Sequence, residues 1–340
     1  MRPVLILCLS AVALAAGVTA AHFISSGTVL SLLTQAVIYA VFAQGVGVLM
    51  RQNGMVSFGH ALFFGVTGYA LGLLLQVQGL PPEAAIVFAV AIVTVVAFVL
   101  GLVIVRVPGI AFGMLTLALG QACYLSASRS RGLMGGTDGM NINWPSSIFG
   151  APVSALQTPA AMFLLCWVVL VLVITGLSLV MRGGFGAVTE AVRDNEERAR
   201  FIGIRTLMPR ALVFALSAFV TSLGGVLAAF NTGFVSPESL HWSVSGVALM
   251  MVIIGGTRAM WGPALGAIVY FLFKDVLGDY AEHWMAIFGV ALIAVTVFFP
   301  RGLAGSVSAL ASRFTKGGPA VTSGAVTQRD EGMRRTRRGA

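Results

Sequence analysis

The chain contains a series of apolar segments, each close to the length of about 20 residues that an α-helix needs to cross a bilayer. A backbone exposed to lipid must satisfy its hydrogen bonds within the segment, so these segments predict helices and not an open sheet. We therefore expect an all-α polytopic membrane protein with eight to ten transmembrane helices. The candidate spans are residues 4–24, 28–50, 55–78, 84–105, 109–127, 160–181, 209–230, 244–257, 259–274 and 283–300.

Three of these spans need comment. The spans at residues 244–257 and 259–274 are short for full crossings, so we expect a short or broken helix pair there. The first span, residues 4–24, resembles the apolar core of a signal peptide. We expect it to stay as an uncleaved helix, because the next apolar segment begins within a few residues.

Composition excludes an ordinary soluble domain. The chain is 58% hydrophobic and only 10% charged, whereas soluble domains are about 45–50% apolar and about 25% charged. The three cysteines (Cys8, Cys123 and Cys166) lie in apolar surroundings without metal-type spacing. We therefore expect neither disulfides nor a zinc site.

The net charge of +9 is concentrated rather than spread. Fourteen of the 21 lysines and arginines lie in residues 182–210 and 301–340. By the positive-inside rule this clustering sets topology, so we expect both regions and both termini in the cytoplasm and no nucleic-acid partner. Arg51, Arg106 and Arg258 then also lie inside, and Arg129 and Arg131 are exceptions. The acidic residues that lie outside are Glu83, Asp138, Glu238, Asp279 and Glu282.

Several glycines recur four or so residues apart, and this spacing favours close packing of helices in lipid. They are Gly65, Gly68 and Gly72; Gly109 and Gly113; and Gly262 and Gly266. The stretch "RQNGMVSFGHALFFGVTGY" differs because polar residues interrupt or border its apolar run. Polar groups at membrane depth either bond neighbouring helices or line a path, and both interpretations stay open here.

No catalytic motif is present. The four histidines lack zinc-protease or triad-type neighbours, and no paired carboxylates lie in the apolar segments. A phosphate-binding P-loop needs Gly-Lys-Ser/Thr, and neither Lys274 nor Lys316 has that context. We expect a chain without its own ATPase site and without a cofactor or metal. Channels and secondary carriers remain compatible with these features.

The stretch "TEAVRDNEERARFIGI" (residues 189–204) is the most charged part of the chain outside the tail, with six charged residues among the eight at 193–200. Apolar residues recur at helical spacing: Ala187, Val188, Ala191 and Val192. The pattern predicts one or two short amphipathic helices, with a favourable pair between Glu196 and Arg200. Such a segment is either a solvated loop or a docking surface for a partner.

In four stretches the chain resembles the membrane permeases of ABC importers for branched-chain amino acids, of the LivM type. The stretches are "NGMVSFGHALFFGVTGY", "GMLTLALGQACYLSASRSRGLMGGTDGM", "GGFGAVTEAVRDNEERARFIGI", and "GFVSPESL" with "VIIGGTRAMWGPALGA" and "FFPRGLAG". The resemblance covers roughly residues 35–308 and implies an ABC importer permease fold in the bacterial inner membrane.

The resemblance implies transport driven by separate proteins. The expected partners are two cytoplasmic ABC ATPase subunits, a second homologous permease (a heterodimer), a periplasmic substrate-binding protein and membrane lipid. The coupling loop would be residues 182–208, with Glu190, Arg193, Asn195, Glu197, Ala199 and Gly203 as its contact residues. The chain departs from the family at Leu207 and Pro209, which come early, and at Thr257 and Arg258.

For a transport role, the expected substrate-path residues are Asn53, Ser57, His60, Thr116, Gln121 and Asn231. Branched-chain or related amino acids are the expected cargo. Urea or short amides are the alternative within transport, and an ATP-independent channel or carrier, or a structural membrane protein, are rivals of other classes. We expect residues 1–303 to form the permease domain and residues 304–340 a disordered basic cytoplasmic tail.

Overall fold

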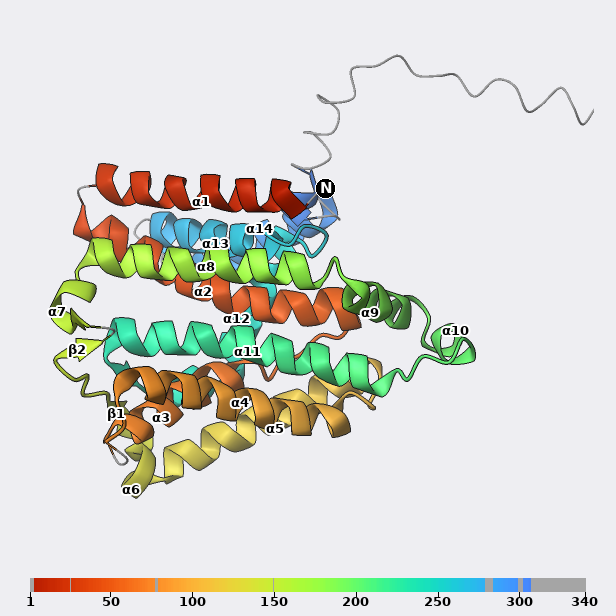
Figure 1. Ribbon diagram of the computed structural model, residues 1–340, viewed down its shortest axis with the longest axis horizontal. Coiled ribbons are helices and arrows are strands. Elements are labelled where there is room, and N and C mark those ends of the chain that lie inside the picture. The colour runs from red at the N-terminus through yellow and green to blue at the C-terminus, as the bar shows by residue number, and fades with distance from the viewer. Residues whose placement is uncertain are drawn as a thin grey trace, which may run out of the picture. The chain divides into compact units, whose positions relative to one another are not determined.

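The computed structural model describes residues 3–24, 26–76, 79–148, 150–278, 284–298 and 302–306, and it shows an all-α polytopic membrane protein (Figure 1). Six of its helices are long and apolar enough to cross a bilayer. These are α1 (Pro3–Phe23), α2 (Gly27–Asn53), α4 (Pro82–Ile104), α5 (Gly109–Arg129), α8 (Pro159–Val180) and α11 (Leu207–Thr232). Four shorter apolar helices fall on the remaining expected spans: α3 (Ala61–Gln76), α12 (Trp242–Gly255), α13 (Gly262–Gly278) and α14 (Trp284–Phe298).

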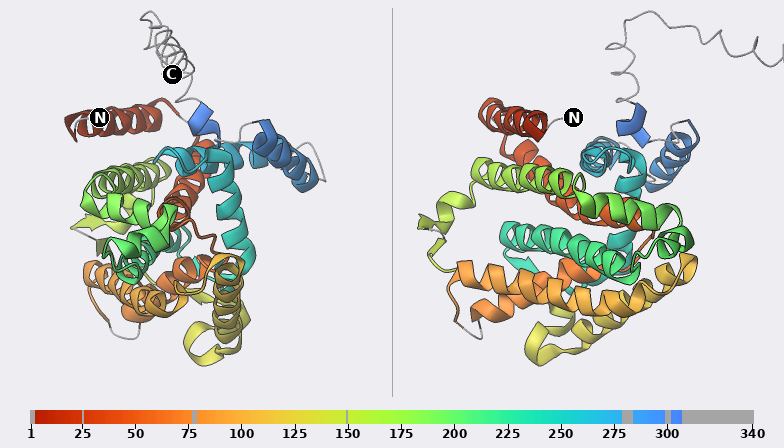
Figure 2. Two further views of the ribbon diagram at one scale, coloured as in Figure 1. Left: turned by 90° about the vertical axis from the view of Figure 1, so that its right-hand side faces the viewer. Right: turned by 45° about the vertical axis from the view of Figure 1, so that its right-hand side comes forward.

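Helices α2 and α11 lie side by side at the centre of the bundle (Figures 1 and 2). About three quarters of each apolar window is buried, 78% in α2 and 72% in α11, against 11% in α1. Helices α3, α4, α8, α12 and α13 pack around this pair, whereas α1 packs mainly on α8. The bundle therefore has two buried helices surrounded by helices that expose an apolar face to lipid.

The expected span at residues 55–78 is wrong in its first part. Helix α2 continues to Asn53 and ends at Gly54, whose φ of 65° places it in the left-handed region. Residues 54–60 are irregular, and α3 begins only at Ala61. The apolar run suggested one long helix, but side chains of neighbouring helices bond the backbone of this segment, as described below.

The short pair expected near residues 244–274 is present as α12 and α13, joined by a turn at residues 256–261. Glycines allow the two helices to touch. A Cβ atom on Gly266 would lie 1.8 Å from the carbonyl oxygen of Met251, and one on Gly255 would lie 1.9 Å from that of Gly262. The predicted packing role of the glycines at 262 and 266 is therefore confirmed.

The glycines of α3 pack in the same way, against side chains. A Cβ atom at Gly65, Gly68 or Gly72 would lie under 3.0 Å from Leu240, Val235 or Met140, respectively. Gly109 differs, because its surroundings are open and its φ is 61°. It serves the turn before α5 and not a helix contact.

Short elements close one end of the bundle. Strand β1 (Met140–Asn141) pairs with β4 (Phe234–Val235) in antiparallel register, with Met140 opposite Val235. Around them lie α6 (Arg131–Met134), η1 (Gly136–Asp138), β2 (Ser147–Ile148), β3 (Ala151–Pro152), α7 (Val153–Leu156) and η2 (Pro237–Leu240). We call this end the acidic end, after Asp138 and Glu238. Residues 307–340 of the tail predicted for residues 304–340 lie outside the described residues, as do Asp279 and Glu282, whereas residues 302–306 are helical.

Replacing Gly266 by leucine is expected to lower the free energy of unfolding by about 1–3 kcal/mol or more, because α12 and α13 must separate to admit the side chain. The measurement is the thermal unfolding midpoint of the purified protein in detergent. Gly246→Leu is the matched control, since Gly246 also lies in α12 but nothing approaches within 4 Å of its added Cβ. Equal midpoints for the two variants would contradict this packing.

Candidate functional site

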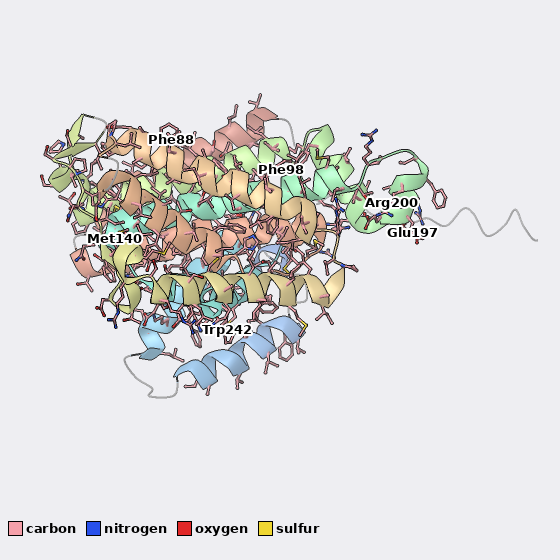
Figure 3. All side chains as sticks on the ribbon, turned by 90° about the horizontal axis from the view of Figure 1, so that it is seen from below. Phe88, Phe98, Met140, Glu197, Arg200 and Trp242 are labelled. Carbon is pink, nitrogen blue, oxygen red and sulfur yellow. The ribbon has the colours of Figure 1, made fainter. Side chains whose placement is uncertain are left out.

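Helices α9 (Gly184–Asp194) and α10 (Glu196–Phe201) project from the bundle beyond the ends of the spanning helices (Figures 1 and 3). Figure 3 shows Glu197 and Arg200 on this projection, at the end opposite Met140. Arg51, Arg193, Arg210 and Arg258 lie at the same end, which we call the basic end. We define residues 182–208 as the projecting loop.

Local sequence explains the two helices of the loop. A Cβ atom on Gly186 would lie 1.9 Å from the carbonyl oxygen of Met181, so α9 can start this close to α8 only with glycine there. Asn195 separates the helices with an extended backbone (φ −159°, ψ 102°), and its Oδ1 accepts a hydrogen bond from the N–H of Arg198 at 2.8 Å. Asparagine is a favoured N-cap, so it ends α9 and begins α10.

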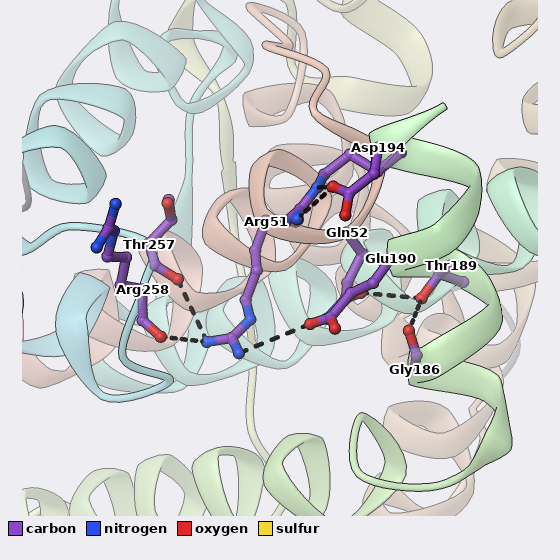
Figure 4. Close-up of polar contacts among 9 residues, drawn as sticks. Arg51, Gln52, Gly186, Thr189, Glu190, Asp194, Thr257 and Arg258 are labelled. Carbon is purple, nitrogen blue, oxygen red and sulfur yellow. Dashed lines mark hydrogen bonds and ion pairs between the residues drawn. The ribbon is translucent and has the colours of Figure 1, made fainter. Parts of the chain in front are cut away.

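Helix α9 is fixed to the bundle by Arg51 and Gln52 at the end of α2 (Figure 4). The Thr189 hydroxyl lies 2.9 Å from Gln52 Oε1, and both side chains are buried. Arg51 donates to the carbonyl oxygens of Arg258 at 2.7 Å and Thr257 at 3.3 Å, and it lies 3.9 Å from the Glu190 carboxylate. The Arg51 side chain therefore joins α2, α9 and the α12–α13 turn.

Helix α9 also holds the backbone of α2. Arg193 donates to the carbonyl oxygen of Arg51 at 2.6 Å and forms an ion pair with Asp194 at 2.7 Å. The last carbonyls of a helix have no intrahelical partner, so this bond satisfies one of them. Together with Thr189 and Glu190, these contacts fix the whole of α9 against the end of α2.

Helix α10 is held through Glu196. Its carboxylate accepts from Arg210 Nη1 at 2.7 Å, from Arg200 Nη2 at 2.5 Å and from the Thr206 hydroxyl at 2.9 Å. The expected pair between Glu196 and Arg200 is confirmed. The ion pair of Glu196 with Arg210 also joins α10 to the start of α11. Asn53 Nδ2 donates to the backbone oxygen of Arg210 at 3.0 Å, which joins this cluster to α2.

These contacts shift the pKa of Glu196. Partial burial alone would raise the pKa of the carboxyl, but the hydrogen bonds from Thr206 and Arg200 and the charges of Arg210 and Arg200 outweigh it and lower the pKa below its ordinary value. Glu196 is therefore ionised at neutral pH and holds three partners at once.

The tip of the projecting loop is apolar. Phe201 is 90% exposed and Ile202 is 72% exposed. The run "FIGI" is apolar in the sequence, yet the structure leaves its first two side chains exposed at the tip of the loop. The expected apolar face of α9 is also shifted, because the structure buries Gly186, Thr189 and Val192 and exposes Ala187 and Ala191. Amphipathic spacing alone did not identify which face α2 covers.

The six predicted coupling residues fall into two groups. Glu190, Arg193 and Asn195 hold the loop in shape through the bonds given above. Ala199 is buried inside the loop, where its carbonyl oxygen accepts from the N–H of Ile204. Glu197 is exposed on α10, and Gly203 ends α10 with a φ of 87°. Only Glu197 among the six presents a charged side chain outward from α10.

A second polar cluster holds the irregular segment at residues 54–60. His60 bridges two serines, with Nδ1 2.8 Å from Ser57 Oγ and Nε2 2.6 Å from Ser217 Oγ. The Ser217 hydroxyl also donates to the carbonyl oxygen of Gly45 in α2 at 2.7 Å. All three polar side chains are at most 1% exposed.

Two further helices bond the backbone of this segment. The Thr116 hydroxyl of α5 accepts from the N–H of Phe58 at 3.3 Å, and the Ser245 hydroxyl of α12 accepts from the N–H of Ala61 at 2.7 Å. In the described chain, side chains from two helices thus bond backbone N–H groups that a continuous helix would bond internally, and Ser217 of a third helix holds the His60 ring. We call this set of contacts the helix-break cluster.

The predicted substrate-path residues lie at different depths. Ser57, His60 and Thr116 are buried in the helix-break cluster, and Asn53 lies at the basic end. Asn231 is exposed at the acidic end, in a cavity of about 380 Å³ that Gln35, Tyr39, Ser236 and Glu238 also line. Gln121 lies along α5, and Oε1 of its side chain has no hydrogen-bond partner in the described part of the chain. The structure does not bring the six together.

Comparison with known proteins matches most of the chain to one family. Residues 28–296 match the family described as branched-chain amino acid transport system / permease component. The chain is 24% identical over 300 residues to the high-affinity branched-chain amino acid transport system permease protein LivM of Escherichia coli, covering 82% of this chain and 70% of that protein.

Other relatives are named for different cargo. The autoinducer 2 import system permease protein LsrC of Salmonella paratyphi B is 28% identical over 304 residues, covering 84% of this chain and 82% of that protein. The fructose import permease protein FruF of Bifidobacterium longum is 29% identical over 138 residues, covering 38% of each chain. No solved structure matches.

Glu196→Gln is expected to loosen α10, because the neutral amide cannot hold Arg200 and Arg210 as ion pairs. Charged hydrogen bonds contribute about 1–3 kcal/mol when buried, and the partial exposure here places the expected effect near 1 kcal/mol. The measurement is hydrogen exchange of the backbone amides at residues 195–206. Glu197→Gln is the control on the same helix, and equal exchange in both variants would contradict the cluster.

The same cluster predicts a pH dependence. The folded pKa of Glu196 is lowered from 4.5, so its contribution to stability is present above about pH 4.5 and is lost as the pH falls through the lowered value. Protection of residues 195–206 in the native protein should fall in this acidic range. In Glu196→Gln the loss of hydrogen-exchange protection on acidification should be smaller than in the native protein. If protection falls with pH identically in both proteins, the Glu196 carboxylate is not the cause of the loss.

Ser217→Ala is expected to destabilise the bundle by about 1–3 kcal/mol, because it removes a partner from buried His60 and from the carbonyl of Gly45. The measurement is the thermal unfolding midpoint in detergent. Ser126→Ala is the matched control, since the Ser126 hydroxyl is exposed and bonds only to Ala122 of its own helix. A Ser217→Ala midpoint as high as that of the control would show that the helix-break cluster contributes nothing.

Proposed function

This chain belongs to the branched-chain amino acid transport system permease family, and we propose that it is the membrane-spanning permease subunit of an ATP-driven ABC importer. The single observation that carries this proposal is the projecting loop. It is fixed to the bundle at Arg51 and Glu196, yet it exposes Phe201 and Ile202 at its tip. A rigid loop with an apolar tip outside the lipid suits a groove on a second protein.

The partners follow from this role. A permease without its own ATPase site needs two separate cytoplasmic ABC ATPase subunits, and we assign the projecting loop as the coupling loop that meets one of them. Arg51, Arg193, Arg210 and Arg258 gather at the same end as the loop, and the positive-inside rule places that end in the cytoplasm. The acidic end then faces a periplasmic binding protein, across the inner membrane of a bacterial cell.

A second homologous permease completes the proposed importer, as a heterodimer. This arrangement also separates the proposal from an ATP-independent channel or carrier, which would need neither a coupling loop nor an ATPase. Co-purification of an ATPase subunit and a second permease with the tagged chain supports the importer. Uptake by this chain alone in liposomes, without ATP, would support the channel or carrier.

Branched-chain or related amino acids are the cargo that we propose, because LivM matches over most of the chain. Urea and short amides are the alternative, and the LsrC and FruF matches add sugar-like solutes to the test. The cavity at the acidic end favours small polar cargo: its lining carries the amides of Gln35 and Asn231 and the carboxylate of Glu238 on an otherwise largely apolar wall.

We propose that the substrate path runs past six polar residues: Asn53, Ser57, His60, Thr116, Gln121 and Asn231. Burial of Ser57, His60 and Thr116 favours a role in holding the path wall. Asn231 has direct access to the cavity at the acidic end, so Asn231→Leu is the variant of the six that should slow uptake without loss of membrane protein.

Phe201→Ser is expected to reduce substrate-stimulated ATPase activity and uptake about fivefold or more, because an apolar anchor at an interface is worth about 1–3 kcal/mol. Glu197→Ala, and Gly203→Val at its left-handed backbone position, should also uncouple ATPase activity from uptake. The measurement is paired uptake and ATPase assays on the assembled importer in proteoliposomes.

Leu133→Ser is the matched control for Phe201→Ser. Leu133 is 64% exposed in α6 at the acidic end, so its replacement removes a comparable exposed apolar side chain from the side away from the loop. Normal coupling in the Phe201, Glu197 and Gly203 variants, with the protein inserted, would overturn the assignment of the loop.

Cargo is tested on the substrate-binding protein that works with this chain, because that component usually sets cargo in the family. Calorimetric titration with leucine, urea, acetamide and fructose compares the named classes directly. We expect leucine to bind and the other three not to bind. Binding of any of the other three in place of leucine would replace the amino-acid proposal while leaving the permease role intact.

A further inference from the structure

A deep cleft opens at the basic end between α1, α8 and the α12–α13 turn. Its volume is about 510 Å³, within the range of about 300–1,000 Å³ that is usual for ligand sites. Most of its walls are apolar. They come from one face of α1, from one face of α8 that includes Val171, Thr175 and Met181, and from the turn, which contributes Trp261.

The shape of the cleft follows from the way α1 meets α8. The indole N–H of Trp167 donates to the carbonyl oxygen of Ala13 at 2.8 Å, and the Trp167 ring lies where a Cβ on Gly17 would be. These contacts close the gap between the two helices near the middle of the membrane. Toward the basic end α1 has little other support, since only 11% of its apolar window is buried.

The depth of the cleft matches one leaflet of a bilayer. At 1.5 Å per residue, the lining face of α8 from Val171 to Met181 spans about 15 Å, half of the hydrocarbon core of about 30 Å. Trp261 lies at the mouth, 39% exposed, where tryptophan is favoured at the membrane–water interface. An acyl chain lying along α8 would thus begin at the interface and end near Trp167.

Three arginines surround the mouth of the cleft: Arg51, Arg182 and Arg258. Arg182 and Arg258 are exposed, and Arg51 is half-buried beside Arg258 (Figure 4). Glu190 lies 3.9 Å from Arg51 and offsets part of its charge, but the residues that line the described cleft include no aspartate or glutamate. An apolar cleft with a positively charged mouth at the interface is complementary to a lipid phosphate and its chain.

We propose that this cleft is a binding site for one anionic glycerophospholipid, with its phosphate at Arg51, Arg182 and Arg258 and one acyl chain between α1 and α8. The lipid fills the gap that α1 leaves and so fastens α1 to the bundle. Because Arg51 also holds α9 and the α12–α13 turn, the lipid phosphate lies next to the contacts that fix the projecting loop.

Native mass spectrometry of the purified full chain in detergent tests the site. The chain is titrated with dioleoyl phosphatidylglycerol, with dioleoyl phosphatidylcholine and with inorganic phosphate. We expect a saturable one-to-one complex with phosphatidylglycerol only. If phosphatidylcholine binds as tightly as phosphatidylglycerol, the arginines do not select an anionic lipid. If inorganic phosphate binds as tightly, the site is one for soluble anions. Either result overturns the proposal.

Two variant pairs locate the lipid. The double variant Arg182→Gln with Arg258→Gln should weaken phosphatidylglycerol binding about 30-fold, since each arginine near anionic lipid is worth about 1 kcal/mol. Arg129→Gln with Arg131→Gln, at the acidic end, is the control and should bind normally. Equal affinities in the two double variants would place the lipid elsewhere.

The acyl chain is tested on adjacent residues of α8. Thr175→Phe fills the cleft and should weaken phosphatidylglycerol binding at least about tenfold. Gly176→Phe is the control, because Gly176 is exposed, does not line the cleft and has nothing within 4 Å of an added Cβ. This variant should bind phosphatidylglycerol normally. The proposal fails if Thr175→Phe binds as well as Gly176→Phe.

Discussion

The structure depends on one constraint, which is that a backbone group inside a membrane must find a hydrogen-bond partner in the protein. In the described bundle the chain meets this constraint mainly with helices, and at residues 54–60 the backbone leaves helical geometry between α2 and α3. There the hydroxyls of Thr116 and Ser245 take over the bonding of the free N–H groups, and His60 links the segment to Ser217. Helix α11 packs closely around this point because Gly45 of α2 presents no side chain toward Ser217 and Thr221, and Gly225 of α11 presents none toward Phe64 of α3.

Helix α2 connects this buried cluster to the surface that we assign to the ATPase. Its middle accepts a hydrogen bond at Gly45 from Ser217, and its end carries Arg51 and Gln52, which hold α9. A load on the projecting loop therefore acts first on the end of α2 and on the α12–α13 turn. Both elements pack into the bundle core, so the loop is joined to the centre of the membrane domain by continuous contacts and not by a flexible linker.

Much of the fold was predictable from the sequence, because long apolar segments have few alternatives in lipid. The ten apolar helices of the described chain, the short pair α12 and α13 among them, fall on the spans expected from length and hydropathy, except that α3 begins at Ala61 and not at residue 55. The break before α3 did not follow, since it is stabilised by Ser217 and Ser245, more than 150 residues away along the chain. Hydropathy records how apolar a segment is but not which distant hydroxyl reaches its backbone.

The candidate site was predictable in location but not in detail. Charge density identified the loop, and helical spacing identified the Glu196–Arg200 pair. Arg210 was missed as the partner of Glu196, although its position just after Pro209 at the start of an apolar span is a usable signal. Phe201 and Ile202 were not among the predicted contact residues of the loop, because an apolar side chain in a sequence looks the same whether lipid or a partner protein covers it.

Site-specific crosslinking tests most directly whether the tip of the projecting loop meets an ATPase. A photoreactive phenylalanine analogue is placed at residue 201 in intact cells, with the same analogue at residue 133 for comparison. The account predicts a covalent adduct between residue 201 and an ATPase subunit, and none from residue 133. Absence of that adduct from a correctly inserted protein, or equal adducts from both positions, would contradict it.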